Sequence, residues 1–424
     1  MANPYRVRTL KLASGEHLPV LMDTRLGMPL FTPTIYSLTQ LRGRDLATNT
    51  IAQGLRHIMV LLLFLEQREI DIESRFREGR ILDLAEIESL VNTCKLHVAD
   101  MATVPQTVSV KPARVTTVER YRMCSLVVGP KTIDGQSAAT RIRTIADYLS
   151  WLAKAQLLKL PAGSPSFLAL ETTRQMVIET LKARMPETGG RNTLDARMGL
   201  ASDTATRLLA VTARNSQENP WVGEFIKCRN ELIFRWLHSF GLRRGELLNV
   251  KVSDIDFRQE TVTVVRRADA PEDPRSEQPV VKTRDRILPI PPDLCRLTHD
   301  YVLSARRKWS GARRHEYLFV ADKTGAPLSL SALNKCFAFL RACIPDLPAD
   351  LSPHVLRHTW NDNFSEAMDR IKAPAADEQK MRSFLMGWSE TSGTAAKYTR
   401  RHVRKKANQI SLLMQSKMTG EDDI

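Results

Sequence analysis

The sequence predicts a mainly α-helical protein with a small β-sheet, organised as a helical domain and a second domain of mixed α/β structure. Apolar residues recur at helical spacing in residues 49–65 and 142–152, and again beyond residue 350. Residues 261–290 instead hold two short runs rich in β-branched side chains. With 424 residues, 43% of them hydrophobic, the chain can bury more than one core. We therefore expect two domains.

The first part of the chain reads as a small appendage followed by the helical domain. Residues 1–45 contain strand-like pieces separated by glycine and proline, with too little apolar bulk to fold alone. Residues 46–160 follow as the helical domain. Arg141, Arg143 and Lys154 lie on or beside the polar side of its second predicted helix, where they could meet phosphates or simply be solvated.

A linker and the second domain come next. Residues 161–196 include PAGSP and MPETGGRNT, and such clusters of proline and glycine are typical of a linker. The second domain is expected over residues 197–424. Its first long helix, about residues 225–239, ends at Gly241, which can adopt the left-handed backbone of a C-cap. Arg243 then starts a new helix, where backbone N–H groups and the helix dipole favour an anionic ligand.

The rest of the second domain is predicted to be a hairpin followed by helices. Residues 261–267 and 279–290 are expected to pair as a hairpin or as part of a small sheet. His354 and Arg357 are three residues apart, so they share one face of a helix. A later helix is expected to carry Tyr398.

The charge balance points to a polyanionic partner. The chain has 62 Lys and Arg against 47 Asp and Glu, a formal net charge of +15, and a pI near 9.7. Nucleic acid is the first candidate, although a basic surface can also serve solubility alone.

Cysteine usage and hydropathy indicate a cytoplasmic protein with no membrane partner. No CxxC pair occurs, and no histidine stands at zinc-finger spacing from a cysteine, so we expect reduced thiols and no metal site of that kind. The N-terminus lacks the apolar region of a signal peptide. The longest apolar run, residues 58–65, is too short to span a bilayer.

Five motifs then follow one another in the second half of the chain: GLRRGELLNVKVSDIDF, KTRDRILP, HVLRHT, LMGWSE and KYTRRH. In this order and at this spacing the chain resembles the tyrosine recombinases, the phage-integrase type of site-specific DNA recombinase. The likeness is tightest over residues 225–404. A weaker likeness over residues 49–154 is to the family's helical core-binding domain. The resemblance implies a DNA core-binding domain at 46–160 and a tyrosine-recombinase catalytic domain at 197–424.

The resemblance also implies a DNA strand transferase that works without metal, ATP or any other cofactor. Tyr398 would attack phosphorus and form a 3′-phosphotyrosine, which conserves the bond energy for rejoining. Arg243 and Arg357 would bind the non-bridging oxygens of the phosphate. Lys282 would protonate the leaving 5′ oxygen, and His354 would accept the tyrosine proton or bind the phosphate.

Two departures from the family pattern stand near the C-terminus. Trp388 occupies the place where most members have a histidine; its ring keeps one N–H donor but cannot exchange protons, and it could equally be a packing residue. Tyr398 lies ten residues after Trp388, where the family usually has nine. We expect the loop near Ser392 and Gly393 to absorb the extra residue.

Partners and alternatives follow from the same resemblance. The expected partner is double-stranded DNA at a specific site, bound by a homotetramer or with related recombinases, and located at the bacterial nucleoid. The apolar stretch near the C-terminus is compatible with a helix that docks into a neighbouring protomer or folds back on its own domain. A type IB topoisomerase-like enzyme and a catalytically idle DNA-binding protein are the alternatives.

Other routes to DNA chemistry have less support in the sequence. Asp254 and Asp256 stand in SDIDF, which reads as a turn leading into a strand, and no acidic triad of a metal-dependent transposase accompanies them. The chain has no GxxxxGK[ST] phosphate loop.

Overall fold

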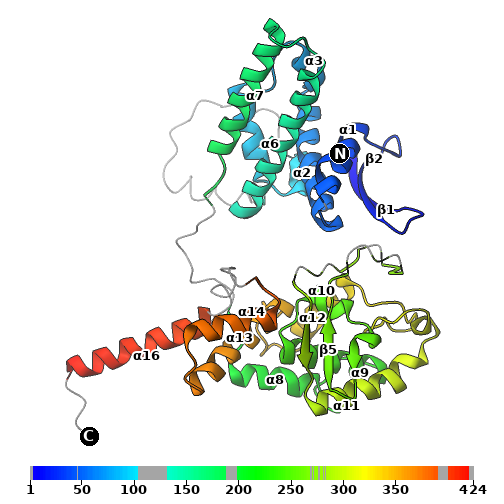
Figure 1. Ribbon diagram of the computed structural model, residues 1–424, viewed down its shortest axis with the longest axis vertical. Helices are drawn as coiled ribbons and strands as arrows, with labels where there is room; N and C mark the ends of the chain where they lie inside the picture. Colours follow the sequence, from blue (N-terminus) through cyan, green and yellow to red (C-terminus); the bar gives the residue numbers. More distant parts are fainter. Residues whose placement is uncertain are drawn as a thin grey trace, which may run out of the picture. The chain divides into compact units, whose positions relative to one another are not determined.

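The computed structural model describes residues 3–44, 46–103, 131–187, 198–267, 270, 272–275, 277–279, 281, 283–389 and 400–419. The chain divides into two compact units (Figure 1). The first comprises residues 1–12 and 17–193, and the second comprises residues 13–16 and 194–424.

The first unit combines a small antiparallel sheet with a helical bundle. The sheet has the order β1-β2-β3, with Val7 opposite Leu21. Its strands are β1 (Tyr5–Lys11), β2 (His17–Asp23) and β3 (Met28–Pro29). The helices are α1 (Phe31–Tyr36), α2 (Thr48–Gln67), α3 (Ile72–Arg77), α4 (Leu84–Cys94), α6 (Gly135–Leu157) and α7 (Pro165–Ala183). Short 3-10 or π turns cover Ser37–Leu41, Arg42–Arg44 and Val98–Thr103.

Helix α2 is the core helix of this unit, as its apolar periodicity predicts. Leu55, Ile58 and Leu61 are fully buried, and the helix packs against α6 and strand β2. By length and composition α2 could also cross a membrane, but 67% of its apolar window is buried inside the protein. The burial is what a helix with apolar residues on most of its faces requires.

The predicted linker over residues 161–196 is wrong for the part that forms helix α7. Ser164 caps the helix by accepting the Phe167 N–H at 3.2 Å, and Pro165 takes the first helical position. PAGSP is therefore a helix start rather than a flexible joint. Leu170 and Leu181 of α7 lie in the same core as α2 and α6.

Arg141 differs from what its sequence context suggests. Arg141 is buried, and its Nη1 donates to the carbonyl oxygens of Cys94 at 3.0 Å and Leu96 at 2.9 Å. Its guanidinium therefore holds the end of α4 and is not presented to a phosphate. The N-terminal sheet shares the core of this unit, to which Leu21 of β2 contributes.

The second unit surrounds a small sheet with helices. Strands β4 (Ile255–Asp256), β5 (Thr261–Val264) and β6 (Arg286–Pro289) pair antiparallel in the order β4-β5-β6, which confirms the hairpin. The helices are α8 (Ser202–Thr212), α9 (Glu224–Phe240), α10 (Arg244–Asn249), α11 (Pro292–Asp300), α12 (Leu330–Cys343), α13 (Pro353–Arg370), α14 (Ala375–Met386) and α16 (Arg400–Thr419). Short 3-10 or π turns cover Val252–Asp254, Tyr301–Ala305, Arg306–Lys308 and Ser310–Arg314. The chain is thus mainly helical with small sheets, as predicted.

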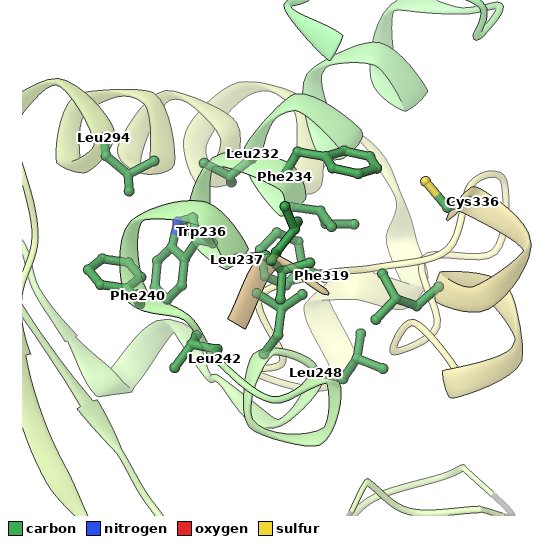
Figure 2. Close-up of a cluster of buried hydrophobic side chains, with 14 of the residues drawn as sticks. Leu232, Phe234, Trp236, Leu237, Phe240, Leu242, Leu248, Leu294, Phe319 and Cys336 are labelled. Atoms are coloured by element: carbon green, nitrogen blue, oxygen red, sulfur yellow. The ribbon is translucent and has the colours of Figure 1, made fainter. Parts of the chain in front are cut away.

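Helix α9 forms the centre of this second core. Figure 2 shows Trp236, Leu237 and Phe240 within the cluster of apolar side chains, and all three are buried. The Trp236 Nε1 donates to Thr298 Oγ1 of α11 at 3.0 Å, so its one polar atom is satisfied inside the core. Helix α9 also packs against α8 and α13.

The end of α9 requires a glycine, as predicted. Gly241 has φ 57° and closes the helix through its N–H to the Leu237 carbonyl at 3.0 Å. A Cβ at this position would lie 2.9 Å from the side chain of Trp360 on α13. Both the backbone conformation and the close approach of α13 therefore exclude larger residues.

The packing of α7 predicts a matched pair of stability effects. Leu170→Ala, at a fully buried site, is expected to lower the free energy of unfolding by about 2–5 kcal/mol, because it leaves a cavity. Leu168→Ala on the same helix is the control, since Leu168 is 56% exposed. Urea unfolding of the full chain, followed by circular dichroism, measures both. Equal effects would show that α7 does not belong to the core.

Candidate functional site

The turn after α9 brings Arg243 and Arg357 to one place. Arg243 is the N-cap residue of α10 and follows Gly241 by two positions. Arg357 lies on α13 and is fully buried. Its Nη1 donates to the Gly241 carbonyl oxygen at 2.7 Å. The same turn therefore sets the start of α10 and anchors the Arg357 side chain.

The Glu246 carboxylate lies among three arginines. Its Oε2 accepts from the Arg243 backbone N–H and from Arg286 Nη2, both at 2.9 Å. Its Oε1 accepts from Thr283 Oγ1 at 2.6 Å and from Arg243 Nη1 at 3.3 Å. Arg357 Nη1 lies 3.8 Å from Oε2. Glu246 is 1% exposed, so one buried carboxylate holds residues from α10, β6 and α13.

This environment keeps Glu246 ionised. Burial alone would raise the pKa of the carboxyl, but the positive charges of Arg286 and Arg357 and the hydrogen bonds from Thr283 and Arg243 outweigh it. The net result lowers the pKa of Glu246 from its ordinary 4.5 to about 2. A buried carboxylate of this kind is stable only because its hydrogen-bonding capacity is filled.

The end of α14 completes the surroundings of Arg357. Helix α14 closes at Gly387, which has φ 65°. Arg286 Nε donates to the Leu385 carbonyl at 2.7 Å, and Arg357 Nη2 donates to the Met386 carbonyl at 3.3 Å. The guanidinium carbon of Arg357 lies 5.2 Å from the centre of the Trp388 ring. Trp388 is buried beside Met386 and thus packs against the arginine by a cation–π contact.

His354 stands at the start of α13, on the same face as Arg357. Pro353 occupies the first turn of the helix, and the His354 side chain is exposed. Its ring centre lies 4.9 Å from that of the buried His358, with the two planes at 89°. His358 therefore supports the position of the His354 ring.

A basic pocket of about 620 Å³ joins these residues. Among the described residues, four arginines and a histidine line it against a single carboxylate, and Ser352 at the N-cap of α13 lies in its wall. The lining residues are Arg243, Arg244, Asn334, Arg341, Ala349, Asp350, Ser352, Pro353, His354 and Arg357. Guanidinium forks and the N-terminus of an 18-residue helix both favour a bound anion, such as a phosphate.

The structure thus brings together four of the six residues singled out from the sequence. Arg243, His354 and Arg357 line the pocket, and Trp388 packs behind Arg357. Lys282 and Tyr398 lie outside the described residues.

The sequence reading missed the part played by Arg286. Arg286 lies on β6, where it is 4% exposed and ion-paired to Glu246. Strand alternation could have found it: along β6, Arg286 and Leu288 face inward while Ile287 faces out. An inward-facing arginine needs buried acceptors for its N–H groups, and here the Glu246 carboxylate is one of them.

The two aspartates of SDIDF have structural partners. Asp254 pairs with Arg267 at 2.5 Å and accepts the Lys251 N–H at 2.8 Å. Asp256 accepts the backbone N–H groups of the following turn, at Arg258 and Gln259. In the part of the chain that the structure describes, no three His, Cys, Asp or Glu residues gather as a metal site.

Comparison with known proteins finds similarity to one family in this unit. Residues 200–405 match the model of the phage integrase family. Tyrosine recombinase XerA of Thermococcus onnurineus (strain NA1) is 30% identical over 189 residues, which are 44% of this chain and 57% of that protein. Tyrosine recombinase XerA of Thermococcus kodakarensis (strain ATCC BAA-918 / JCM 12380 / KOD1) is 28% identical over 195 residues, 46% of this chain and 58% of that protein.

The chain therefore spans less than three fifths of the length of these curated relatives. Among solved structures, the Tn1549 transposon integrase in complex with circular intermediate DNA superposes loosely, with a TM-score of 0.46 and 12% identity. That match covers 89% of this chain and 99% of the other.

The buried ion pair between Arg286 and Glu246 predicts that two arginines of the same hairpin contribute unequally to the free energy of unfolding. Arg286→Ala is expected to lower the free energy of unfolding by about 3–5 kcal/mol, because it removes a counter-charge from a buried carboxylate. Arg284→Ala removes an exposed side chain two residues away and is expected to change it by less than about 0.5 kcal/mol. Urea unfolding of the two variants measures the difference. Similar values would contradict the contacts described for Glu246.

The lowered pKa of Glu246 predicts a loss of stability in acid. The folded protein holds this carboxyl ionised to lower pH than the unfolded chain does, so its contribution is complete above pH 4.5 and disappears as pH falls towards 2. The native chain should therefore have a larger free energy of unfolding than Glu246→Gln at neutral pH. This difference should become smaller as the pH falls from 4.5 towards 2. Urea unfolding of both chains across a pH series measures this difference. A difference that does not change with pH would refute the lowered pKa of Glu246.

Proposed function

Through residues 200–405 the chain belongs to the tyrosine recombinases of the phage integrase family, and on that premise we propose that it is a site-specific DNA recombinase. It cuts and rejoins strands through a 3′-phosphotyrosine intermediate. The observation that carries the proposal is the basic pocket, in which Arg243, His354 and Arg357 converge from two segments more than a hundred residues apart.

The two arginines bind the reacting phosphate. Negative charge grows on the non-bridging oxygens as phosphorus is attacked, and fixed guanidiniums stabilise it without reorganisation. Arg357 is held by two carbonyl oxygens and by Trp388, and Arg243 is held by Glu246. Their positions are therefore set before DNA binds, which is the condition for strong electrostatic catalysis.

The remaining steps are assigned from the sequence motifs. The Tyr398 phenol oxygen attacks phosphorus and forms the new P–O bond while the bond to the 5′ oxygen breaks. His354 accepts the phenol proton, and Lys282 delivers a proton to the leaving 5′ oxygen. Rejoining is the reverse sequence, with a 5′ hydroxyl attacking the phosphotyrosine. Protein side chains supply every group in this scheme, so it needs no metal or nucleotide.

The proposed partner is double-stranded DNA at a specific site, bound by four copies of the chain. The helical unit contributes the core-binding contacts, and assembly uses helix α16. The side chains of Ile410, Leu412 and Met414 on α16 are 58–64% exposed, as expected for a surface that a neighbouring protomer covers. In a bacterial cell the assembled enzyme would be found at the nucleoid.

A type IB topoisomerase-like enzyme uses a similar site and is distinguished by its product. It would relax supercoiled plasmid of any sequence, whereas a recombinase forms covalent complexes at defined sites. A catalytically idle DNA-binding protein would form no covalent complex at all.

Trapping of the covalent complex tests the nucleophile. The full chain is incubated, in excess EDTA, with a library of nicked duplexes of random sequence, and complexes that survive detergent are recovered and sequenced. We expect a small set of enriched sites with the native chain. Tyr398→Phe should yield no covalent complex because it lacks the attacking oxygen, yet should keep its affinity for duplex DNA.

Tyr5→Phe, in the first unit, is the matched control and should trap DNA as the native chain does. Covalent complexes with Tyr398→Phe would refute the nucleophile. Trapping that depends on added magnesium would refute the metal-free scheme, and cleavage with no enriched sequence would favour the topoisomerase.

A further inference from the structure

We propose that the basic pocket holds two consecutive phosphates of one DNA strand, and that Arg244, with Asn334 and Arg341 of α12, forms the second subsite. The first subsite is the one already described, formed by Arg243 and Arg357. The inference rests on the proposed function, because it takes the ligand of the first subsite to be a DNA phosphate.

The neighbouring residues Arg243 and Arg244 line different parts of the pocket. Arg243 and Arg244 are the N-cap and the first residue of α10, and successive positions of a helix point about 100° apart. The Arg243 guanidinium lies against Glu246. The Arg244 Nη1 instead reaches Asn334 Oδ1 on α12 at 3.4 Å. Both side chains nevertheless line the same cavity.

The pocket is long enough for more than one phosphate. Asn334 and Arg341 are seven residues apart on α12, which places them on one face and about 10 Å apart along the helix axis. Both contribute to the pocket wall. Successive phosphates of one strand advance by only about 3.4 Å along the axis of B-DNA. Because Arg244 follows Arg243 directly and contacts Asn334 of α12, a strand that places one phosphate at Arg243 brings a neighbouring phosphate towards this wall.

The guanidinium groups of Arg244 and Arg341 on this wall have N–H groups that can bind a ligand. Among the described residues, Arg244 makes no ion pair, and its one hydrogen bond is to a neutral amide. Arg341 donates its Nη1 to the Leu351 carbonyl at 2.6 Å, which fixes the side chain and leaves its remaining N–H groups for a ligand. By contrast, Arg275 and Arg286 of the same unit are buried against carboxylates.

Within the described part of the pocket wall, Asp350 is the one residue that opposes an anion. Its carboxylate is exposed, so solvent weakens its field at the pocket. Removing this charge should therefore strengthen the binding of a second phosphate. The subsite holds the strand beside the reacting bond and orients it for attack; Arg244 is thus a positioning residue.

Salt-dependent binding tests the second subsite in the full chain. A fluorescent 30-base-pair duplex of random sequence is titrated with the native protein and with Arg244→Ala at several salt concentrations. We expect Arg244→Ala to weaken binding by about tenfold and to reduce the slope of log K against log salt by about 0.9, the loss of one phosphate contact. Arg244→Lys keeps the charge and should recover most of the slope.

Arg296→Ala is the matched control, because Arg296 is an exposed arginine of α11 outside the pocket. Arg296→Ala should leave the affinity for the duplex and the slope of log K against log salt unchanged. Asp350→Asn should raise the affinity for the duplex. If Arg244→Ala matches Arg296→Ala, the second subsite is refuted.

Short competitors separate this inference from the proposed function. The dinucleotide TpT carries one phosphate, and its 5′-phosphorylated form pTpT carries two. We expect pTpT to displace the duplex from the native protein at lower concentration than TpT does, and Arg244→Ala to lose this preference. Arg243→Ala should weaken the binding of both. A preference that survives in Arg244→Ala overturns the second subsite alone, whereas a native chain with no affinity for duplex DNA overturns the proposed function as well.

Discussion

The buried carboxylate of Glu246 is the interaction on which the rest of the second unit depends. It is the shared partner of Arg243, Arg286 and Arg357, which come from three elements separated by up to 114 residues. Three guanidiniums this close to one another would repel strongly in a low-dielectric interior. The carboxylate offsets that repulsion, and its lowered pKa shows how strongly the surroundings favour the ionised form.

Two backbone turns position the arginines of this ion cluster at the basic pocket. Gly241 and Gly387 both adopt left-handed backbone at the ends of helices, and each is approached so closely that a Cβ would clash. Their tight turns let the carbonyls of Gly241 and Met386 reach Arg357. Because the Arg357 guanidinium donates to these two carbonyl oxygens, the side chain is held in place. The pocket is therefore preorganised for an anion. The pocket and the packing around Arg357 thus depend on the same turns.

The sequence predicts best those elements whose signals are local. The apolar period of α2, the glycine after α9 and the β-branched runs of the hairpin all appear where expected, because each depends on residues a few positions apart. Helix α7 was mistaken for a linker because its start, a serine cap followed by proline, uses the same residues as a loop. Arg141 was misread and the place of Arg286 was missed for another reason: whether an arginine is solvated or buried depends on partners from distant segments. Arg286 finds its carboxylate 40 residues away.

In the proposed reaction, the rate at which the covalent DNA complex forms in a single turnover tests the central role of Glu246 most directly. Glu246→Gln keeps the size of the side chain and removes its charge, and Glu231→Gln is the matched change at a buried glutamate of α9 that does not line the pocket. If Glu246 sets the positions of the two arginines, Glu246→Gln should slow the reaction by at least about tenfold, while Glu231→Gln leaves the rate near that of the native chain. A rate for Glu246→Gln equal to that of Glu231→Gln would contradict the account.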